Sequence, residues 1–142
     1  MAMGAPGMEE DYRSFLAFWN AGDRERDKAL QLLFLAWMHW ADPPFVTGMD
    51  ADADAKRLWH DIFAHFGGEE ATDAEFLHVA SVMASIFPWE LGDEIGWEAA
   101  AEQMRQRAIK YRPEGFQPEL FEGRGDYGEY FAHHARYVPV RH

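Results

Sequence analysis

The sequence predicts an all-α protein with a single domain, and three observations support this class. Apolar residues recur at helical spacing through most of the chain, whereas no segment alternates as a half-buried strand does. Glycine or proline follows nearly every periodic run, as expected where helices end. The chain has 142 residues, of which 48% are hydrophobic, and this is the usual size of one domain with enough apolar surface for a core. We therefore expect a bundle of about five helices, arranged as two helical hairpins with flanking helices.

The expected helices follow one another along the first 113 residues. Residues 1–8 contain Gly and Pro without periodicity, which indicates a disordered tail. Beyond this tail, the periodic runs predict helices over residues 9–20, 23–40, 52–66, 72–88 and 94–111. Residues 9–113 form the expected bundle. Residues 114–142 form a loop-rich C-terminal extension with one short helix over residues 127–136.

Local signals explain where these helices begin and end. The fourth begins with Thr72-Asp-Ala-Glu75, a capping-box sequence. Gly22 and Gly67-Gly68 end the first and third, because glycine readily adopts the left-handed conformation of a helix stop. Proline blocks helix continuation, so the other three are expected to stop at Pro43-Pro44, Pro88 and Pro113. The turns at residues 44–48 and 88–92 share the order Pro, aromatic, two residues, Gly. This likeness indicates either an internal duplication or a repeated use of common helix-stop chemistry.

The second and fourth helices are apolar on almost every side, which is typical of helices in the middle of a bundle. The fourth has only a narrow polar stripe, formed by His78, Ser81 and Ser85. The first, third and fifth helices have broad polar faces and are expected to pack around the other two. The apolar positions of the second, third and fourth helices predict a core that contains Leu33, Trp37, Leu58, Ile62, Leu77, Ala80 and Met83.

Charge and composition exclude several classes of function. The chain carries 25 Asp and Glu against 13 Lys and Arg, a formal net charge of −12, and so negative a surface repels nucleic-acid phosphates. The absence of Cys excludes disulfides, thiolate metal sites and cysteine nucleophiles. No apolar run is long enough to span a bilayer, and the N-terminus does not resemble a secretory signal. We expect a cytoplasmic protein that binds neither nucleic acid nor membrane. Ten Arg against three Lys indicate a GC-rich bacterial genome.

Three patterns resemble ligand sites but fit structural roles better. Residues 50–61 have the acidic spacing of an EF-hand, but Ala55 stands where that loop needs glycine, so these acids are expected to cap the third helix. Residues 123–128 match G-x-G-x-x-G, but they do not follow the strand that a nucleotide-binding fold requires. Glu75 and His78 have the spacing of one di-iron element, but a second element is missing and Glu75 is expected to cap its own helix. We therefore expect no metal and no cofactor.

His39 and His78 are the strongest candidates for a site, because each lies on a helix that is expected to be buried. A buried imidazole must find partners for both ring nitrogens or stay neutral through a lowered pKa. One interpretation is a core histidine whose nitrogens are satisfied by a backbone carbonyl, a Ser or a carboxylate. The other is a pocket between the second and fourth helices, with candidate residues His39, His78, Ser81, Ser85, Trp37 and Trp40.

The C-terminal extension contains a segment whose aromatic side chains would be exposed to water unless they pack against another surface. Its candidate interface or lid residues are Phe121, Arg124, Asp126, Tyr127, Tyr130, Phe131, His133 and His134. Gly123, Gly125 and Gly128 lie between these residues and argue against tight packing on the same bundle. We therefore expect a homodimer that buries the aromatic side chains. The alternative is that the segment folds back as a lid over the opening between the second and fourth helices.

Two functions from different classes remain open. The charge of −12 favours a non-enzymatic interaction protein that binds itself or a basic protein partner, for example as an inhibitor or immunity protein. The alternative is a small-molecule binding protein or enzyme with an aromatic, His-lined pocket. A large exposed aromatic or acidic patch over a closed core would favour the first. A cavity above about 300 Å³ with convergent His, Ser and Tyr would favour the second.

Overall fold

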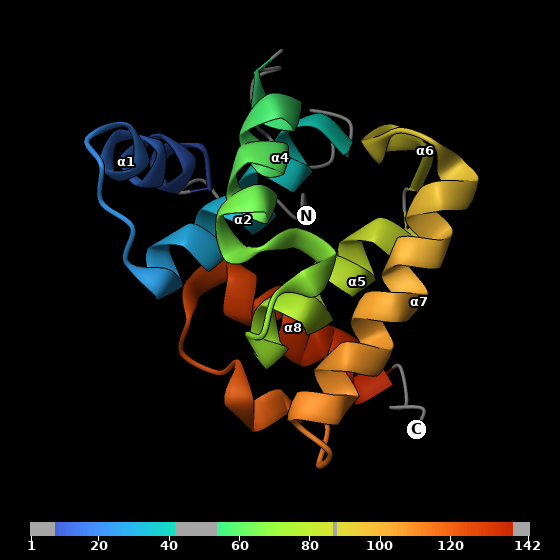
Figure 1. Ribbon diagram of the computed structural model, residues 1–142. Coiled ribbons are helices and arrows are strands. Elements are labelled where there is room, and N and C mark those ends of the chain that lie inside the picture. Colours follow the sequence, from blue (N-terminus) through green and yellow to red (C-terminus); the bar gives the residue numbers. More distant parts are fainter. Residues whose placement is uncertain (1–7, 42–53, 87, 138–142) are drawn as a thin grey trace. The chain divides into compact units, whose positions relative to one another are not determined.

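The computed structural model describes residues 8–41, 54–86 and 88–137 (Figure 1). Every regular element within these ranges is a helix, which confirms the all-α prediction for this part of the chain. The chain divides into two compact units, residues 1–62 and residues 63–142. None of the described helices is both long and apolar enough to cross a membrane.

The first unit contains α1 (Met8–Asn20), α2 (Arg26–Ala41) and most of α4 (Ala55–Phe66). The turn between α1 and α2 forms at Gly22, whose φ of +94° is the left-handed conformation expected there. Its N–H donates to the carbonyl of Trp19 at 3.0 Å, and the N–H of Asp23 donates to that of Phe18 at 2.9 Å. These two bonds are a Schellman motif, so the predicted end of the first helix is confirmed.

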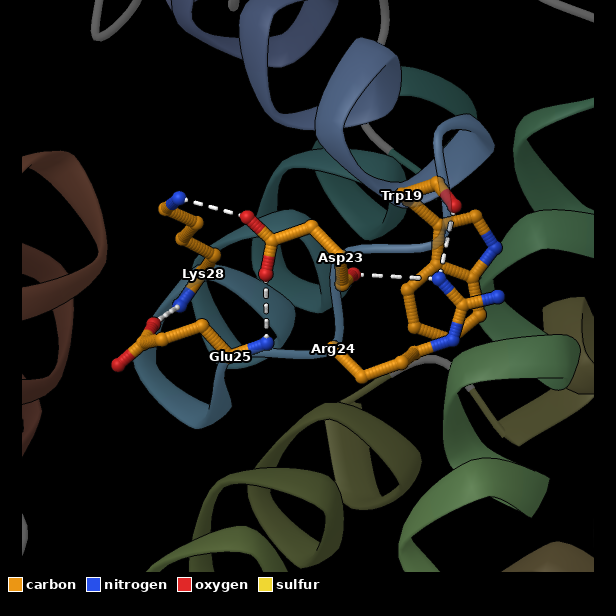
Figure 2. Close-up of polar contacts among 5 residues, drawn as sticks. All are labelled: Trp19, Asp23, Arg24, Glu25 and Lys28. Atoms are coloured by element: carbon orange, nitrogen blue, oxygen red, sulfur yellow. Dashed lines mark hydrogen bonds and ion pairs between the residues drawn. The ribbon is translucent and has the colours of Figure 1, made fainter.

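Side chains in the same turn define the start of α2 (Figure 2). The Asp23 carboxylate accepts hydrogen bonds from the backbone N–H of Glu25 at 2.9 Å and from the Lys28 ammonium at 2.7 Å. Glu25 in turn accepts from the backbone N–H of Lys28 at 2.7 Å, which satisfies a helix N–H that has no partner within the helix. Arg24 lies 3.6 Å over the Trp19 ring and donates to the Trp19 carbonyl at 2.7 Å. The turn is therefore held by contacts between residues close in sequence.

The second unit is built around two long helices, α5 and α7, which pack along each other. A four-residue helix, α6, packs against α7, and the C-terminal helix α8 packs against the short 3-10 helix η2. The elements of this unit after α4 are, in order, η1 (Gly68–Glu70), α5 (Ala74–Ile86), α6 (Pro88–Leu91), α7 (Glu94–Tyr111), η2 (Pro118–Leu120) and α8 (Gly125–Tyr137).

The expected number of five helices is too low for the described residues, and Pro88 explains part of the difference. The sequence predicts a fourth helix that runs to Pro88, whereas α5 ends at Ile86 and Pro88 begins α6. Proline is tolerated at the first position of a helix, because the N–H that it lacks would have no partner within the helix. The C-terminal helix is also longer than expected, with 13 residues. Residues 1–7, the turn at 44–48 and Asp50 and Asp52 lie outside the described residues.

The predicted core residues are buried, as the helical periodicity indicated. Exposed fractions range from 0% to 8% for Leu33, Trp37, Leu58, Ile62, Leu77, Ala80 and Met83. Large aromatic side chains outside this predicted set are also fully buried, among them Tyr12, Trp59, Phe76 and Phe116. The second and fourth predicted helices, now α2 and α5, therefore contribute most of their side chains to the interior.

Candidate functional site

A cavity of about 300 Å³ lies within the second unit, between α5, α7, α8 and the segment before η2. From α5 it is lined by His78, Ser81, Val82 and Ser85. From α7 it is lined by Glu98, Ala101, Glu102, Arg105, Ala108 and Ile109. Phe116, His134 and Ala135 complete the lining. This volume is at the lower end of the range for small-molecule pockets in proteins.

Helical periodicity places these side chains on one face of each long helix. His78, Ser81 and Ser85 of α5 are spaced by three and four residues, so they project from the same side. The lining residues of α7 repeat in the same way, and two of them, Ala101 and Ala108, are small. Because alanine fills little space where two helices pack, these positions leave room for a cavity beside the polar stripe of α5.

The His78 imidazole is held among aromatic rings and has a nitrogen without a partner. Its ring stacks on Phe116 with centroids 4.2 Å apart and planes 10° from parallel, and meets His134 edge-on at 6.3 Å. Its Nε2 is buried and makes no hydrogen bond within the described residues. Burial, and secondarily the nearby His134, lower the pKa of His78 to about 3. At neutral pH the imidazole is therefore uncharged, with one nitrogen that can donate and one that can accept.

The two serines of the stripe are bonded to their own helix. The Ser81 hydroxyl donates to the backbone carbonyl of His78 at 2.7 Å, and the Ser85 hydroxyl donates to that of Val82 at 2.9 Å. Neither serine donates its proton to an imidazole nitrogen, as an activated nucleophile would. Each hydroxyl oxygen keeps a lone pair with which it can accept a hydrogen bond. The stripe therefore offers two hydroxyl oxygens that can accept hydrogen bonds.

Three charged side chains of α7 complete the lining. Glu102 and Arg105 form a close ion pair, with Nη2–Oε2 at 2.5 Å and Nε–Oε1 at 3.0 Å. The hydrogen bond from Arg105 lowers the pKa of Glu102, and the same bond raises the pKa of Arg105. Glu98, one turn earlier on α7, is exposed and has no hydrogen-bond or ion-pair partner among the described residues. The charged part of the lining therefore has an excess of one carboxylate.

His134 of α8 also lines the cavity and is half-buried. Burial first, and the neighbouring His133 second, lower the pKa of His134. Of the other residues proposed for the C-terminal interface or lid, His133 is exposed, whereas Tyr130 and Asp126 are partly buried. His134 therefore lines the same cavity as the polar stripe of α5. From the sequence, His134 was expected to belong either to a dimer interface or to a lid.

Glu75 does not have the capping role that the sequence indicated. The N-terminus of α5 is capped by Asp73, whose carboxylate accepts from the backbone N–H of Phe76 at 3.0 Å. Glu75 is buried, accepts a hydrogen bond from the Tyr127 hydroxyl at 2.5 Å and pairs with Arg124 at 2.8 Å. The capping-box interpretation is therefore wrong. The carboxylate instead connects α5 to the start of α8.

The aromatic side chains of the C-terminal segment are buried within their own unit. Phe121, Tyr127 and Phe131 are each at most 1% exposed, and their rings contact one another at centroid distances of 5.1 to 6.2 Å. Gly128 was expected to loosen this segment but does the opposite. A side chain there would overlap the backbone oxygen of Phe121, so glycine permits the close approach. The exposed apolar surface from which the homodimer was argued is therefore not present in these three residues.

The remaining pocket candidates lie in the first unit. The His39 side chain has no exposed surface, and its Nε2 lies 3.3 Å from the Glu9 carboxylate, while its ring is 4.0 Å from that of Tyr12. Trp37 is 1% exposed, and the side chain of Trp40 lies outside what the structure describes. His39 has a carboxylate partner at Nε2, whereas its Nδ1 is buried and has no hydrogen-bond partner among the described residues, so the interpretation as a satisfied core histidine is met at one nitrogen only. His78, Ser81 and Ser85 are the candidates that line the cavity.

Phe116, Glu98, Glu102 and Arg105 line the cavity but were not proposed from the sequence. The spacing of the three charged residues on α7 matches that of the α5 stripe and was the available signal. In the described parts of the chain, no group of three or more His, Asp or Glu side chains is placed to hold a metal ion. No known protein family, curated protein or solved structure matches this chain.

Proposed function

We propose that this protein binds a small organic molecule in the cavity beside His78. The observation that carries the proposal is the buried Nε2 of His78, which has no partner among the described residues although it belongs to a side chain that lines a cavity of about 300 Å³. A buried polar atom without a partner costs free energy, so its retention is explained if a ligand satisfies it.

The composition of the lining supports binding of an organic molecule. Val82, Ala101, Ala108, Ile109 and Phe116 offer apolar contact, and a few polar side chains are placed among them. This mixture of apolar surface with a small number of polar groups is typical of ligand pockets. His78 and Phe116, whose rings stack on each other, add aromatic atoms to the lining, and these favour a ligand that is itself aromatic.

The competing hypothesis of an acidic interaction protein is supported by the net charge of −12. Large hydrophobic side chains exposed in the described residues are Phe18 on α1 and Ile95 and Tyr111 at opposite ends of α7. Isolated apolar residues of this kind are common on monomer surfaces. Binding of a basic protein remains a prediction that rests on the net charge of the chain. Binding of a second copy also remains a prediction.

The proposal is tested with 1-aminoanthracene, an aromatic fluorophore that is uncharged at neutral pH and brightens in apolar pockets. The wild-type protein should enhance its fluorescence to saturation with one probe per chain. Ala101→Leu places a larger side chain in the cavity and should abolish the enhancement. Ala99→Leu makes the same change at an exposed position of the same helix and should leave the enhancement intact.

Two results would overturn the proposal. One is the absence of saturable enhancement with the wild-type protein. The other is an Ala101→Leu variant that is folded by circular dichroism and binds the probe as tightly as wild type, because binding would then lie elsewhere on the protein.

A further inference from the structure

The charges that line the cavity are not balanced, and this imbalance bears on the ligand. Glu98 and Glu102 supply two negative charges, and Arg105 supplies one positive charge. The Arg105 guanidinium is bonded through both Nε and Nη2 to Glu102, so these two charges compensate each other. Glu98 is left as a carboxylate without a partner among the described side chains.

The imidazoles of the cavity do not restore the balance. His78 and His134 both have a lowered pKa, chiefly because burial disfavours the charged form. Arg112 lies 5.8 Å from the centre of the Phe116 ring and pairs with Glu114 at 3.4 Å. At neutral pH the described side chains that line the cavity therefore have a net negative charge.

We infer that the ligand is an organic amine, whose ammonium group is bound by Glu98 and whose apolar body lies in the cavity beside the stacked His78 and Phe116 rings. This inference rests on the proposed function. An ammonium supplies the positive charge that the lining lacks, together with hydrogen-bond donors for the carboxylate. The apolar body contacts Val82, Ala108 and Ile109, and the uncharged His78 can bond a polar atom of the ligand through Nε2.

A carboxylate ligand fits the same site poorly. It would approach two glutamates, and the guanidinium that could attract it is already bonded to one of them. The charge of the whole chain acts in the same direction, because −12 raises the local concentration of cations and lowers that of anions. The imbalance at the cavity and the charge of the protein therefore favour one ligand class.

Competition for bound 1-aminoanthracene distinguishes the ligand classes. Three competitors have similar bodies and different charges, namely 2-phenylethylamine, 2-phenylethanol and 3-phenylpropionate. The amine should displace the probe about threefold more effectively than the alcohol, which is the size expected for one partly exposed ion pair. The carboxylate should be the weakest of the three, and added salt should reduce the advantage of the amine.

A matched pair of variants tests the role of Glu98. Glu98→Gln should bring the ratio between amine and alcohol close to one. Glu129→Gln removes an exposed carboxylate from α8 that does not line the cavity, and it should leave this ratio unchanged.

The outcomes separate this inference from the proposed function. If the probe binds in the cavity but the alcohol or the carboxylate competes as well as the amine, the ligand class is wrong while the site stands. The same holds if Glu98→Gln leaves the preference for the amine intact. If neither the probe nor any competitor binds, the proposed function fails and the inference fails with it.

Discussion

His39 of α2 and His78 of α5 lie on helices that are apolar on almost every side, yet their imidazoles have different neighbours. In the first unit, the Glu9 carboxylate of α1 lies 3.3 Å from Nε2 of His39. In the second unit, a carboxylate lies one turn before His78 on the same helix, but it is bonded to Arg124 and Tyr127. Nε2 of His78 is left without a partner in the described structure and beside a cavity.

The difference shows that a histidine on an apolar helix is not by itself a sign of function. Whether it indicates a functional site depends on whether a residue from another element forms a hydrogen bond or ion pair with the ring. His39 receives one at Nε2 from α1 and keeps a buried Nδ1 without a partner in the described part of the chain, and it does not line the cavity. His78 does not receive one from Glu75, because that carboxylate is bonded to Arg124 and Tyr127, and its Nε2 is left without a partner among the described residues.

The largest expected effect concerns the two helices that carry these histidines. Leu33 of α2 and Leu77 of α5 are both 0% exposed, and Leu→Ala at either position should lower the free energy of unfolding by about 2–5 kcal/mol. Denaturant unfolding measures both losses. A loss below about 1 kcal/mol for either variant would show that its leucine is not packed in the core. The position of the histidine on that helix would then be wrong, and the comparison of the two histidines would fail.

The next effect tests whether the bonds from Glu75 to Arg124 and Tyr127 stabilise the packing of α8. Glu75→Gln removes the charge that compensates Arg124 and weakens the bond to Tyr127, so the free energy of unfolding should fall by about 1–3 kcal/mol. Tyr127→Phe removes one hydrogen bond and should cost about 1 kcal/mol. Glu129→Gln at an exposed position of α8 serves as the control.

Limited proteolysis should also cut residues 121–137 faster in Glu75→Gln than in wild type. Unchanged stability together with unchanged proteolysis would mean that Glu75 does not secure α8. The reason given for the unpartnered state of His78 would then be wrong.

Replacement of each histidine by phenylalanine compares the two sites directly. His39→Phe removes one partner of the partly buried Glu9 carboxylate, which keeps its ion pair with Arg13 at 3.1 Å, and should cost about 1 kcal/mol of unfolding free energy. His78→Phe keeps a ring that can stack on Phe116 and removes an unsatisfied nitrogen, so stability should stay within about 0.5 kcal/mol of wild type or rise. Equal losses for the two variants would indicate that Nε2 of His78 has a partner, as Nε2 of His39 does.

A smaller effect is expected in the pH dependence of stability. The pKa of His78 is about 3 in the folded protein and close to its ordinary value of about 6.5 when unfolded. As the pH falls below about 6.5, the unfolded chain takes up a proton that the folded chain does not, so stability decreases. His78→Phe lacks this term and should gain about 1.4 kcal/mol relative to wild type between pH 7.5 and pH 5.5. A constant difference across this range would contradict the neutral state of His78.

Much of the helical framework could be predicted from the sequence because its signals are local. The spacing of apolar residues and the glycine stops involve neighbours along the chain, and the bounds of α7 were predicted without error. Pro88 was misjudged because a proline can end one helix or begin the next, and the choice depends on the conformation of the residues after it. The role of Gly128 was misjudged. Its lack of a side chain allows the backbone of Phe121 to approach closely, and helical periodicity does not show this contact.

The candidate site could be predicted only on the side of α5. His78, Ser81 and Ser85 are one local stripe, whereas Phe116, Arg105 and His134 come from other segments and meet this stripe only after the chain folds. Glu75 illustrates the same limit. Its capping-box pattern is local, but Arg124 and Tyr127 lie about fifty residues later in the chain and take the carboxylate instead.

The central claim, that His78 and not His39 faces a ligand, is tested most directly by NMR of the imidazole nitrogens during a titration with 1-aminoanthracene. The His78 resonances, assigned by their absence in His78→Phe, should shift to saturation at the dissociation constant measured by fluorescence. The His39 resonances should stay where they are. If fluorescence saturates while the His78 resonances do not move, or if the His39 resonances move with them, the cavity beside His78 is not the binding site.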